Sequence, residues 1–208
     1  MKKESVLRFT KAGLFLILFY AGIFFRSTPF ITISASLGVL TLFERYLNIK
    51  IPTSFSIVFV VFVVLSLVLG SYADFYEKFP WWDDMLHFSY GIGFSIIGYL
   101  IIYYLYYKKG VENDIFITVA FSFCFTVAFG AIWEIYEYSI DSFFGMNMQR
   151  TEIGRGVDDT MQDIILETLA SLLTNIYIYA YLKAKSNNWI GMLTKKFLDE
   201  NKTDEYKK

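Results

Sequence analysis

The stretch that decides the fold is IPTSFSIVFVVFVVLSLVLGSYA, residues 51–73, which contains no charged side chain. A helix of about 20 residues crosses the hydrocarbon core of a bilayer, so this stretch is long enough to span a membrane. Lipid offers the backbone no hydrogen-bond partners, and only helices or closed barrels satisfy it there. The alternation of apolar and polar residues that marks a barrel strand is absent. The stretch therefore predicts a membrane-spanning helix.

Further apolar runs lie on both sides of this stretch. The chain has 208 residues, of which 55% are hydrophobic, 20% aromatic and 19% charged, whereas about a quarter of a soluble domain is charged. We expect an all-α, polytopic membrane helix bundle with a single domain over residues 1–182. The expected helices are at about 9–25, 30–47, 52–72, 85–107, 115–140 and 160–182.

The basic residues predict the orientation of these six helices. Connections on the cytoplasmic side of a membrane protein are enriched in lysine and arginine. With the N-terminus inside, 15 of the 19 lysines and arginines fall on the inner side. We therefore expect both termini in the cytoplasm of a multi-pass cell-membrane protein. The first run follows Met-Lys-Lys like a signal peptide, but it has no convincing cleavage site, so we expect it to be retained.

The segment 183–208 is polar and is expected to be a cytoplasmic tail. Within it Trp189, Ile190, Leu193 and Phe197 fall on one helical face, which is typical of a short helix lying at the membrane surface. A frayed soluble tail is the alternative.

Composition also excludes some classes of function. The net charge of −1 gives no electrostatic basis for binding nucleic acid. Cys124 is the only cysteine, which excludes an internal disulfide and any metal site built from several cysteines.

Acidic residues gather at one end of the last three expected helices. They occur in WWDDMLHF at residues 81–88, in WEIYEYSID at 133–141 and in VDDTMQDIILE at 157–167. Residues three or four apart share a face of a helix, so each motif forms a stripe. From the helix rise we expect three layers separated by roughly 5–6 Å. The layers, from the outer mouth inward, are Asp84, Asp141 and Asp159; then His87, Glu137 and Asp163; then Glu134 and Glu167.

These stripes predict a cation site. An acid at the centre of a bilayer costs about 2.5–3.5 kcal/mol on insertion scales, and buried ionisable residues in membranes are functional-site candidates. Oxygen-rich ligand sets suit Mg, Mn or Ca, and suit Zn or Fe less well. The expected metal ligands are Asp84, His87, Glu137, Asp141, Asp159 and Asp163. Two alternatives remain open: a protonated acid cluster, and solvated acids beyond shorter helices.

Three functions fit such a site. A metal-dependent hydrolase or transferase would act on a lipid or lipid-linked phosphate, with Glu134 or Glu167 as general base. Arg150 and Arg155 would bind the anionic group of the substrate. A cation- or proton-coupled transporter is less favoured, because the inner halves of the three helices look apolar. A non-catalytic protein that packs helices or binds a partner is the third possibility.

The same motifs resemble a known family. DDMLHF with SYG, WEIYEY with SID, and DDTMQD resemble the YjdF-like family of bacterial membrane-spanning proteins of unknown function, over about residues 81–182. The resemblance implies a polytopic inner-membrane protein and no established reaction. Its recurrent polar positions would correspond to Asp84, His87, Glu134, Glu137, Asp141, Asp159 and Asp163. The D-x-x-H-F segment is also distantly similar to VanZ-type membrane proteins, from which no function is carried over.

Overall fold

The computed structural model describes residues 20, 34, 38, 41–42, 45–46, 49–145, 148–149, 156–185 and 188–201. Within these residues every regular element is a helix. Of the helices expected at about 9–25 and 30–47, the structure describes one and six residues respectively, so both helices stay predictions. The described residues form two compact units, one within Met1–Phe79 and Asp199–Lys208 and the other within Pro80–Leu198.

The first unit contains one apolar helical rod. It comprises α3 (Thr53–Val63) and a π-helical segment, η1 (Val64–Tyr72). The π-helical segment ends with a bond from the Ala73 N–H to the carbonyl of Val68, 2.9 Å away. The short α4 (Phe75–Lys78) follows. The backbone N–H and C=O groups of this rod are hydrogen-bonded to one another along the helix, as we expected for the charge-free stretch at 51–73.

Four helices in the described part of the chain are long and apolar enough to cross a membrane. They are Phe55–Tyr72 in the rod, α5 (Trp82–Lys109), α6 (Ile115–Phe144) and α7 (Gly156–Ala184). The last three are longer than expected, and α5 and α7 begin ahead of their first acidic residues, Asp83 and Asp158. Carboxylates in a first turn meet the positive end of the helix dipole, which favours this earlier start. At the start of α6, Asp114 accepts a hydrogen bond from the Ile117 N–H.

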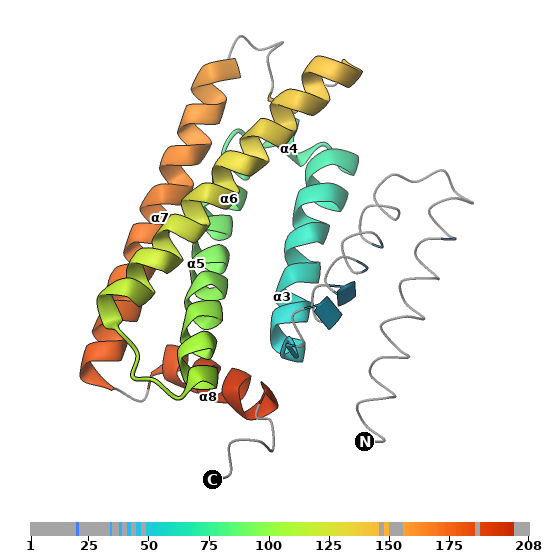
Figure 1. Ribbon diagram of the computed structural model, residues 1–208. Coiled ribbons are helices and arrows are strands. Elements are labelled where there is room, and N and C mark those ends of the chain that lie inside the picture. Colours follow the sequence, from blue (N-terminus) through green and yellow to red (C-terminus); the bar gives the residue numbers. More distant parts are fainter. Residues whose placement is uncertain are drawn as a thin grey trace. The chain divides into compact units, whose positions relative to one another are not determined.

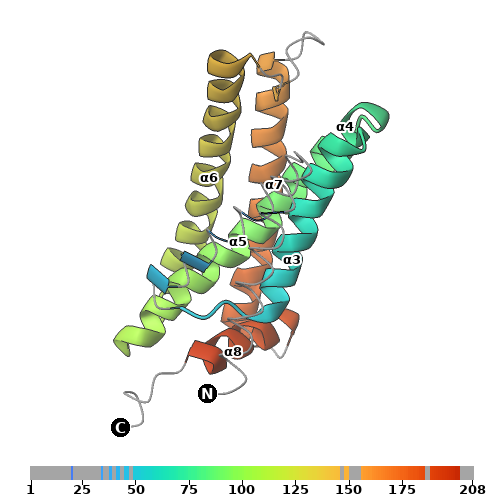
Figure 2. The same cartoon turned by 90° about the vertical axis from the view of Figure 1, so that its right-hand side faces the viewer.

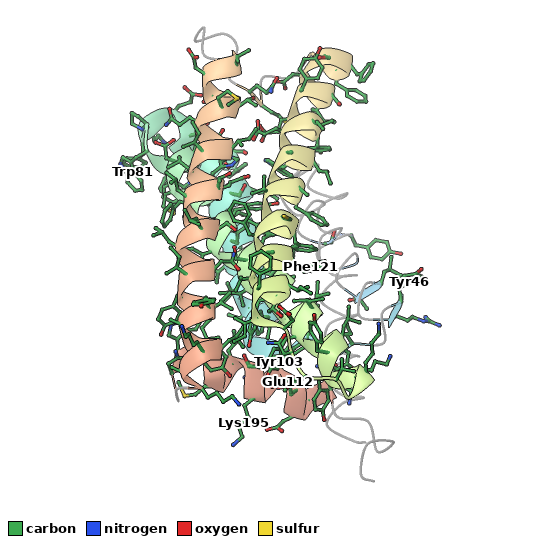
Figure 3. All side chains as sticks on the ribbon, turned by 60° about the vertical axis from the view of Figure 1, so that its left-hand side comes forward. Tyr46, Trp81, Tyr103, Glu112, Phe121 and Lys195 are labelled. Carbon is green, nitrogen blue, oxygen red and sulfur yellow. The ribbon has the colours of Figure 1, made fainter. Side chains whose placement is uncertain are left out.

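Helices α5, α6 and α7 pack against one another within the second unit (Figure 1). Helix α5 is inclined to the other two in the view of Figure 2. We call the end formed by Trp82, Phe144 and Gly156 the acidic end, and the opposite end the lysine end. Figure 3 shows Trp81 toward the acidic end, and Glu112 and Lys195 at the lysine end.

Helix α8 (Trp189–Asn201) lies at the lysine end (Figure 1). Its Thr194 hydroxyl lies 2.9 Å from the Tyr99 hydroxyl, and Phe197 packs edge-on against Tyr104. The buried face differs from the one expected, because Ile190, Thr194 and Phe197 are buried while Trp189 is exposed. These residues are helical, and their position at a membrane surface stays a prediction.

The face of α6 that is buried in this bundle is polar. Every buried residue of α6 is either polar or glycine: Thr118, Ser122, Thr126, Gly130, Glu134 and Glu137. Large apolar side chains such as Phe121, Phe129 and Ile132 are exposed. This pattern is the reverse of a soluble bundle and suits helices with lipid outside, where small and polar residues form the helix contacts.

Candidate functional site

The core of the site is an imidazole held between two helices. His87 of α5 places its Nδ1 atom 2.9 Å from Oε1 of Glu167 on α7. Its Nε2 atom lies 3.6 Å from Asp83 and 3.7 Å from Asp163. Asp83 and His87 are four residues apart and therefore share one face of α5. We call His87, Asp83, Asp163 and Glu167 the imidazole cluster.

The hydrogen bond to Glu167 orients the imidazole ring. An ionised carboxylate can only accept a hydrogen bond, so with Glu167 ionised the Nδ1–H group of His87 donates to it. At 3.6 and 3.7 Å, Nε2 is too far from either aspartate for a normal hydrogen bond. Nε2 faces Asp83 and Asp163, and it can bind a cation when it carries no proton.

Two glycines leave room for Glu167 between closely packed helices. A side-chain carbon at Gly91 of α5 would lie 2.5 Å from the carbonyl oxygen of Glu167 and 2.7 Å from Cβ of Ala170. On α6, a side-chain carbon at Gly130 would collide with the Glu167 carboxylate itself. The two glycines thus leave the space in which Glu167, only 1% exposed, reaches His87.

Three residues of this cluster are placed to share one metal ion. One ligand atom from each of Asp83, His87 and Asp163 lies within 4.8 Å of the others. In many metal sites a carboxylate accepts a hydrogen bond from the second ring nitrogen of a histidine ligand, as Glu167 does here. Two carboxylate oxygens and one imidazole nitrogen can hold Mg, Mn, Ca, Zn or Fe.

Helix α6 contributes two further buried acids, Glu134 and Glu137. Glu137 lies in electrostatic range of Glu134, His87, Asp83 and Asp163. The Thr160 hydroxyl approaches Glu134, but neither carboxylate oxygen of Glu134 makes a hydrogen bond of normal length. All three helices therefore direct acids into one region of the bundle.

The other expected ligands lie outside the imidazole cluster. Asp84 accepts a hydrogen bond from the Gln162 side chain at 2.6 Å. Asp141 accepts the backbone N–H groups of Met148 and Gln149 at 2.6 and 2.8 Å. Both of its oxygens thus hold the loop after α6, which gives Asp141 a structural role.

An open pocket lies at the acidic end beside the cluster. It has a volume of about 450 Å³, and Asp159 is in its wall. Its lining is Pro80, Trp81, Asp84, Asp158, Asp159 and Gln162. The expected substrate-binding residues Arg150 and Arg155 lie outside the described residues.

The structure adds a layer of hydroxyl groups that the sequence analysis missed. The Ser95 hydroxyl of α5 lies 2.8 Å from Oγ of Ser171 on α7 and 3.1 Å from Oγ1 of Thr126 on α6. This one hydroxyl group therefore links the three helices. The Ser122 hydroxyl donates to the carbonyl of Ser95. The expectation that the inner halves of these helices are apolar is wrong for the buried face of α6, whereas α5 and α7 also bury apolar side chains there, such as Leu100, Ile178 and Leu182. The signal was the spacing of Ser122, Thr126, Gly130 and Glu134 at intervals of four residues.

A bundle of membrane-spanning helices with an apolar exterior and buried ionisable side chains defines a polytopic integral membrane protein. The chain belongs to the family described as predicted membrane protein (DUF2238), whose sequence profile matches residues 6–184. This membership confirms the membrane protein of unknown function that the YjdF-like resemblance implied, and the similarity to VanZ-type proteins stays untested.

A relative from Thermotoga maritima is described as an uncharacterized protein. It is 31% identical over 128 residues, which cover 61% of this chain and 62% of the relative. The chain thus matches less than two thirds of that protein. No solved structure matches the chain.

Proposed function

We propose that the protein binds a divalent cation between Asp83, His87 and Asp163, with Mg, Mn or Ca the favoured ions and Zn or Fe less favoured. The observation that carries the proposal is the placement of His87, bonded through Nδ1 to Glu167 while Nε2 faces two carboxylates. Here the distances leave room for an ion between the atoms.

The activity that best fits this cation is metal-dependent hydrolysis or transfer on a lipid or lipid-linked phosphate. The bound cation would supply Lewis-acid chemistry and a reactive water. The described wall of the pocket carries Asp84, Asp158 and Asp159 and no lysine or arginine, so the phosphate would need the cation to offset repulsion. Expected topology places this end at the outer face of the membrane, where lipid head groups are within reach.

The two candidate general bases have different surroundings. The Glu167 carboxylate lies 2.9 Å from Nδ1 of His87, so its role in this proposal is to orient the imidazole. Glu134 is buried and has no hydrogen bond of normal length, so it is the better base for activating a water. In this proposal Asp84, Asp141 and Asp159 are not ligands of the cation.

The test is metal analysis of the full-length protein purified in detergent. We expect the wild-type protein to retain Mn²⁺ after gel filtration and Asp163→Asn to lose it. Asp84→Asn is the matched control, because this acid on the same bundle end is bonded to Gln162 instead of His87. Phosphate release from phospholipid or polyprenyl phosphate should follow metal content. A wild-type protein that binds no divalent cation, under conditions where it stays folded, would refute the proposal.

One observation favours a second function, cation- or proton-coupled transport. The hydroxyl layer of Ser95, Thr126 and Ser171 extends the polar interior from the imidazole cluster toward the lysine end. Still nearer that end, Asn175 has a buried side-chain oxygen without a hydrogen bond. Ion or proton flux into proteoliposomes, reduced by Thr126→Val and retained in Thr174→Val, would favour transport. Thr174 is the control because its hydroxyl bonds the Ala170 carbonyl of its own helix.

A further inference from the structure

Gln149 is a buried polar side chain, between α6 and α7, to which the proposed function gives no role. It is only 9% exposed. Its backbone N–H lies 2.8 Å from Oδ2 of Asp141, which fixes this part of the chain to the end of α6. Its side-chain amide reaches α7 and donates a hydrogen bond of 2.8 Å to the Thr160 hydroxyl. Gln149 is thus held at both ends, and a buried polar group with its partners in place is rigid.

The Thr160 hydroxyl points away from its own helix. A threonine inside a helix commonly donates to the carbonyl four residues earlier, as Thr126 and Thr174 do in this bundle. Among the described residues Thr160 shows no such bond, and its hydroxyl interacts instead with Gln149 and Glu134. A hydroxyl has one hydrogen. Because the Gln149 amide donates to the Thr160 oxygen, that hydrogen is left for the Glu134 carboxylate on α6.

Thr160 is the neutral donor among the neighbours of Glu134. The charged neighbours are His87, Glu167 and Asp159. The two acids cannot donate while they are ionised, and the Nδ1–H group of His87 is directed to Glu167. Glu134 has no hydrogen bond of normal length, so the Thr160 contact orients its carboxylate and leaves a lone pair to receive a proton, as a general base requires.

We propose that Gln149 and Thr160 are positioning residues for Glu134: the amide of Gln149 holds the Thr160 hydroxyl, and this hydroxyl orients the carboxylate. This inference rests on the proposed function, in which Glu134 is the base, and names the residues that set its geometry. Asp141 and Glu134 are seven residues apart and share a face of α6. The contacts therefore run from α6 through Gln149 to α7 and back to α6.

The test observes the Glu134 carboxyl group directly, by infrared spectroscopy of the full-length protein with ¹³C-labelled glutamate. The difference between the wild type and Glu134→Gln identifies the bands of this group. We expect Thr160→Val and Gln149→Leu to shift these bands, and Thr160→Ser, which keeps the hydroxyl, to retain them. Gln162→Leu is the matched control at the same end of the bundle, because its amide bonds Asp84, and it should leave the bands in place.

A second readout is Mn²⁺-dependent phosphate release from polyprenyl phosphate. A misplacement of about 1 Å can lower a rate about 100-fold, so Thr160→Val should lower kcat by about this factor. KM and Mn²⁺ content should stay unchanged, because Thr160 is not among the residues that can share the cation. Thr160→Ser should restore kcat.

The possible results separate this inference from the proposed function. Bands that stay in place in both Thr160→Val and Gln149→Leu would overturn the positioning role, whether or not the protein binds Mn²⁺. A wild-type protein without bound Mn²⁺ would overturn the proposed function, and shifted bands in that protein would still show that Thr160 positions Glu134. If Thr160→Val does not fold, Gln149→Leu decides the question by the same bands.

Discussion

Replacing Gly91 with alanine should separate α5 from α7 and disturb the imidazole cluster. The new Cβ would lie 2.5 Å from the carbonyl oxygen of Glu167 and 2.7 Å from Cβ of Ala170. Neither atom can move by a change of rotamer, so the helices must part by roughly 1 Å to restore ordinary contact. Glu167 would move with α7, and its 2.9 Å bond to His87 would lengthen.

The magnitude follows from comparison with Gly93→Ala on the same helix. A Cβ at Gly93 meets nothing within 4 Å, and both substitutions gain the same helix propensity, about 1 kcal/mol. The difference between the variants is therefore the overpacking term, about 1–3 kcal/mol. For a chain of this size it corresponds to an apparent Tm about 2–12 °C lower for Gly91→Ala.

The assay is thermal unfolding in detergent, followed by Mn²⁺ titration of both variants. Loss of the bond that orients a metal-binding histidine lowers affinity about 10–100-fold, so Gly91→Ala should also bind Mn²⁺ more weakly. Equal Tm values for the two variants would refute the packing argument. A lower Tm with unchanged affinity would refute the link between Glu167 and the cation.

Three further predictions test separate parts of the bundle. Glu167→Gln should lower Mn²⁺ affinity about 10–100-fold, measured by calorimetry, because the amide is a weaker acceptor for His87; unchanged affinity would remove its orienting role. Thr126→Val should lower stability by about 0.6–1.7 kcal/mol through loss of hydroxyl contacts between helices, measured as apparent Tm against Thr174→Val; equal values would refute a role in joining the helices. Asp141→Ala should lower stability by about 1.5–3 kcal/mol per lost bond and leave Mn²⁺ affinity unchanged; weaker Mn²⁺ binding would restore Asp141 as a ligand.

The helices and their polar faces could be predicted because both depend on local spacing. The charge-free stretch at 51–73 is long enough to span a bilayer, and intervals of three or four residues place Glu134 and Glu137 on one face. The structure confirms a multi-pass helical membrane protein. The number of spanning helices beyond the four described, and the orientation of the termini, stay predictions.

The contacts within the site could not be predicted from depth alone. The helix rise placed Glu167 roughly 5 Å below His87, yet the two side chains are hydrogen-bonded. Their meeting depends on the tilt of α5 and on the space left by Gly91 and Gly130, which are properties of packed helices. Asp141 was expected in the cluster because its spacing fits, but spacing does not show that the following loop folds back onto it.

The hydroxyl layer was missed for a related reason. A serine or threonine in an apolar run barely changes hydropathy, and its own helix can satisfy it, as the bond from Thr126 to the Ser122 carbonyl shows. Only tertiary structure reveals that Ser95, Thr126 and Ser171 face one another.

The polar face of α6 has a consequence for how the protein is made. Helix α6 leaves the ribosome before α7, so Glu134 and Glu137 reach the translocon without Asp163, Glu167 or the rest of the bundle to enclose them. Released alone, α6 would expose two acids to acyl chains, at about 2.5–3.5 kcal/mol each for a central position. Synthesis therefore favours holding α6 at the lateral gate until α7 arrives, so that the two segments enter the lipid as a hairpin.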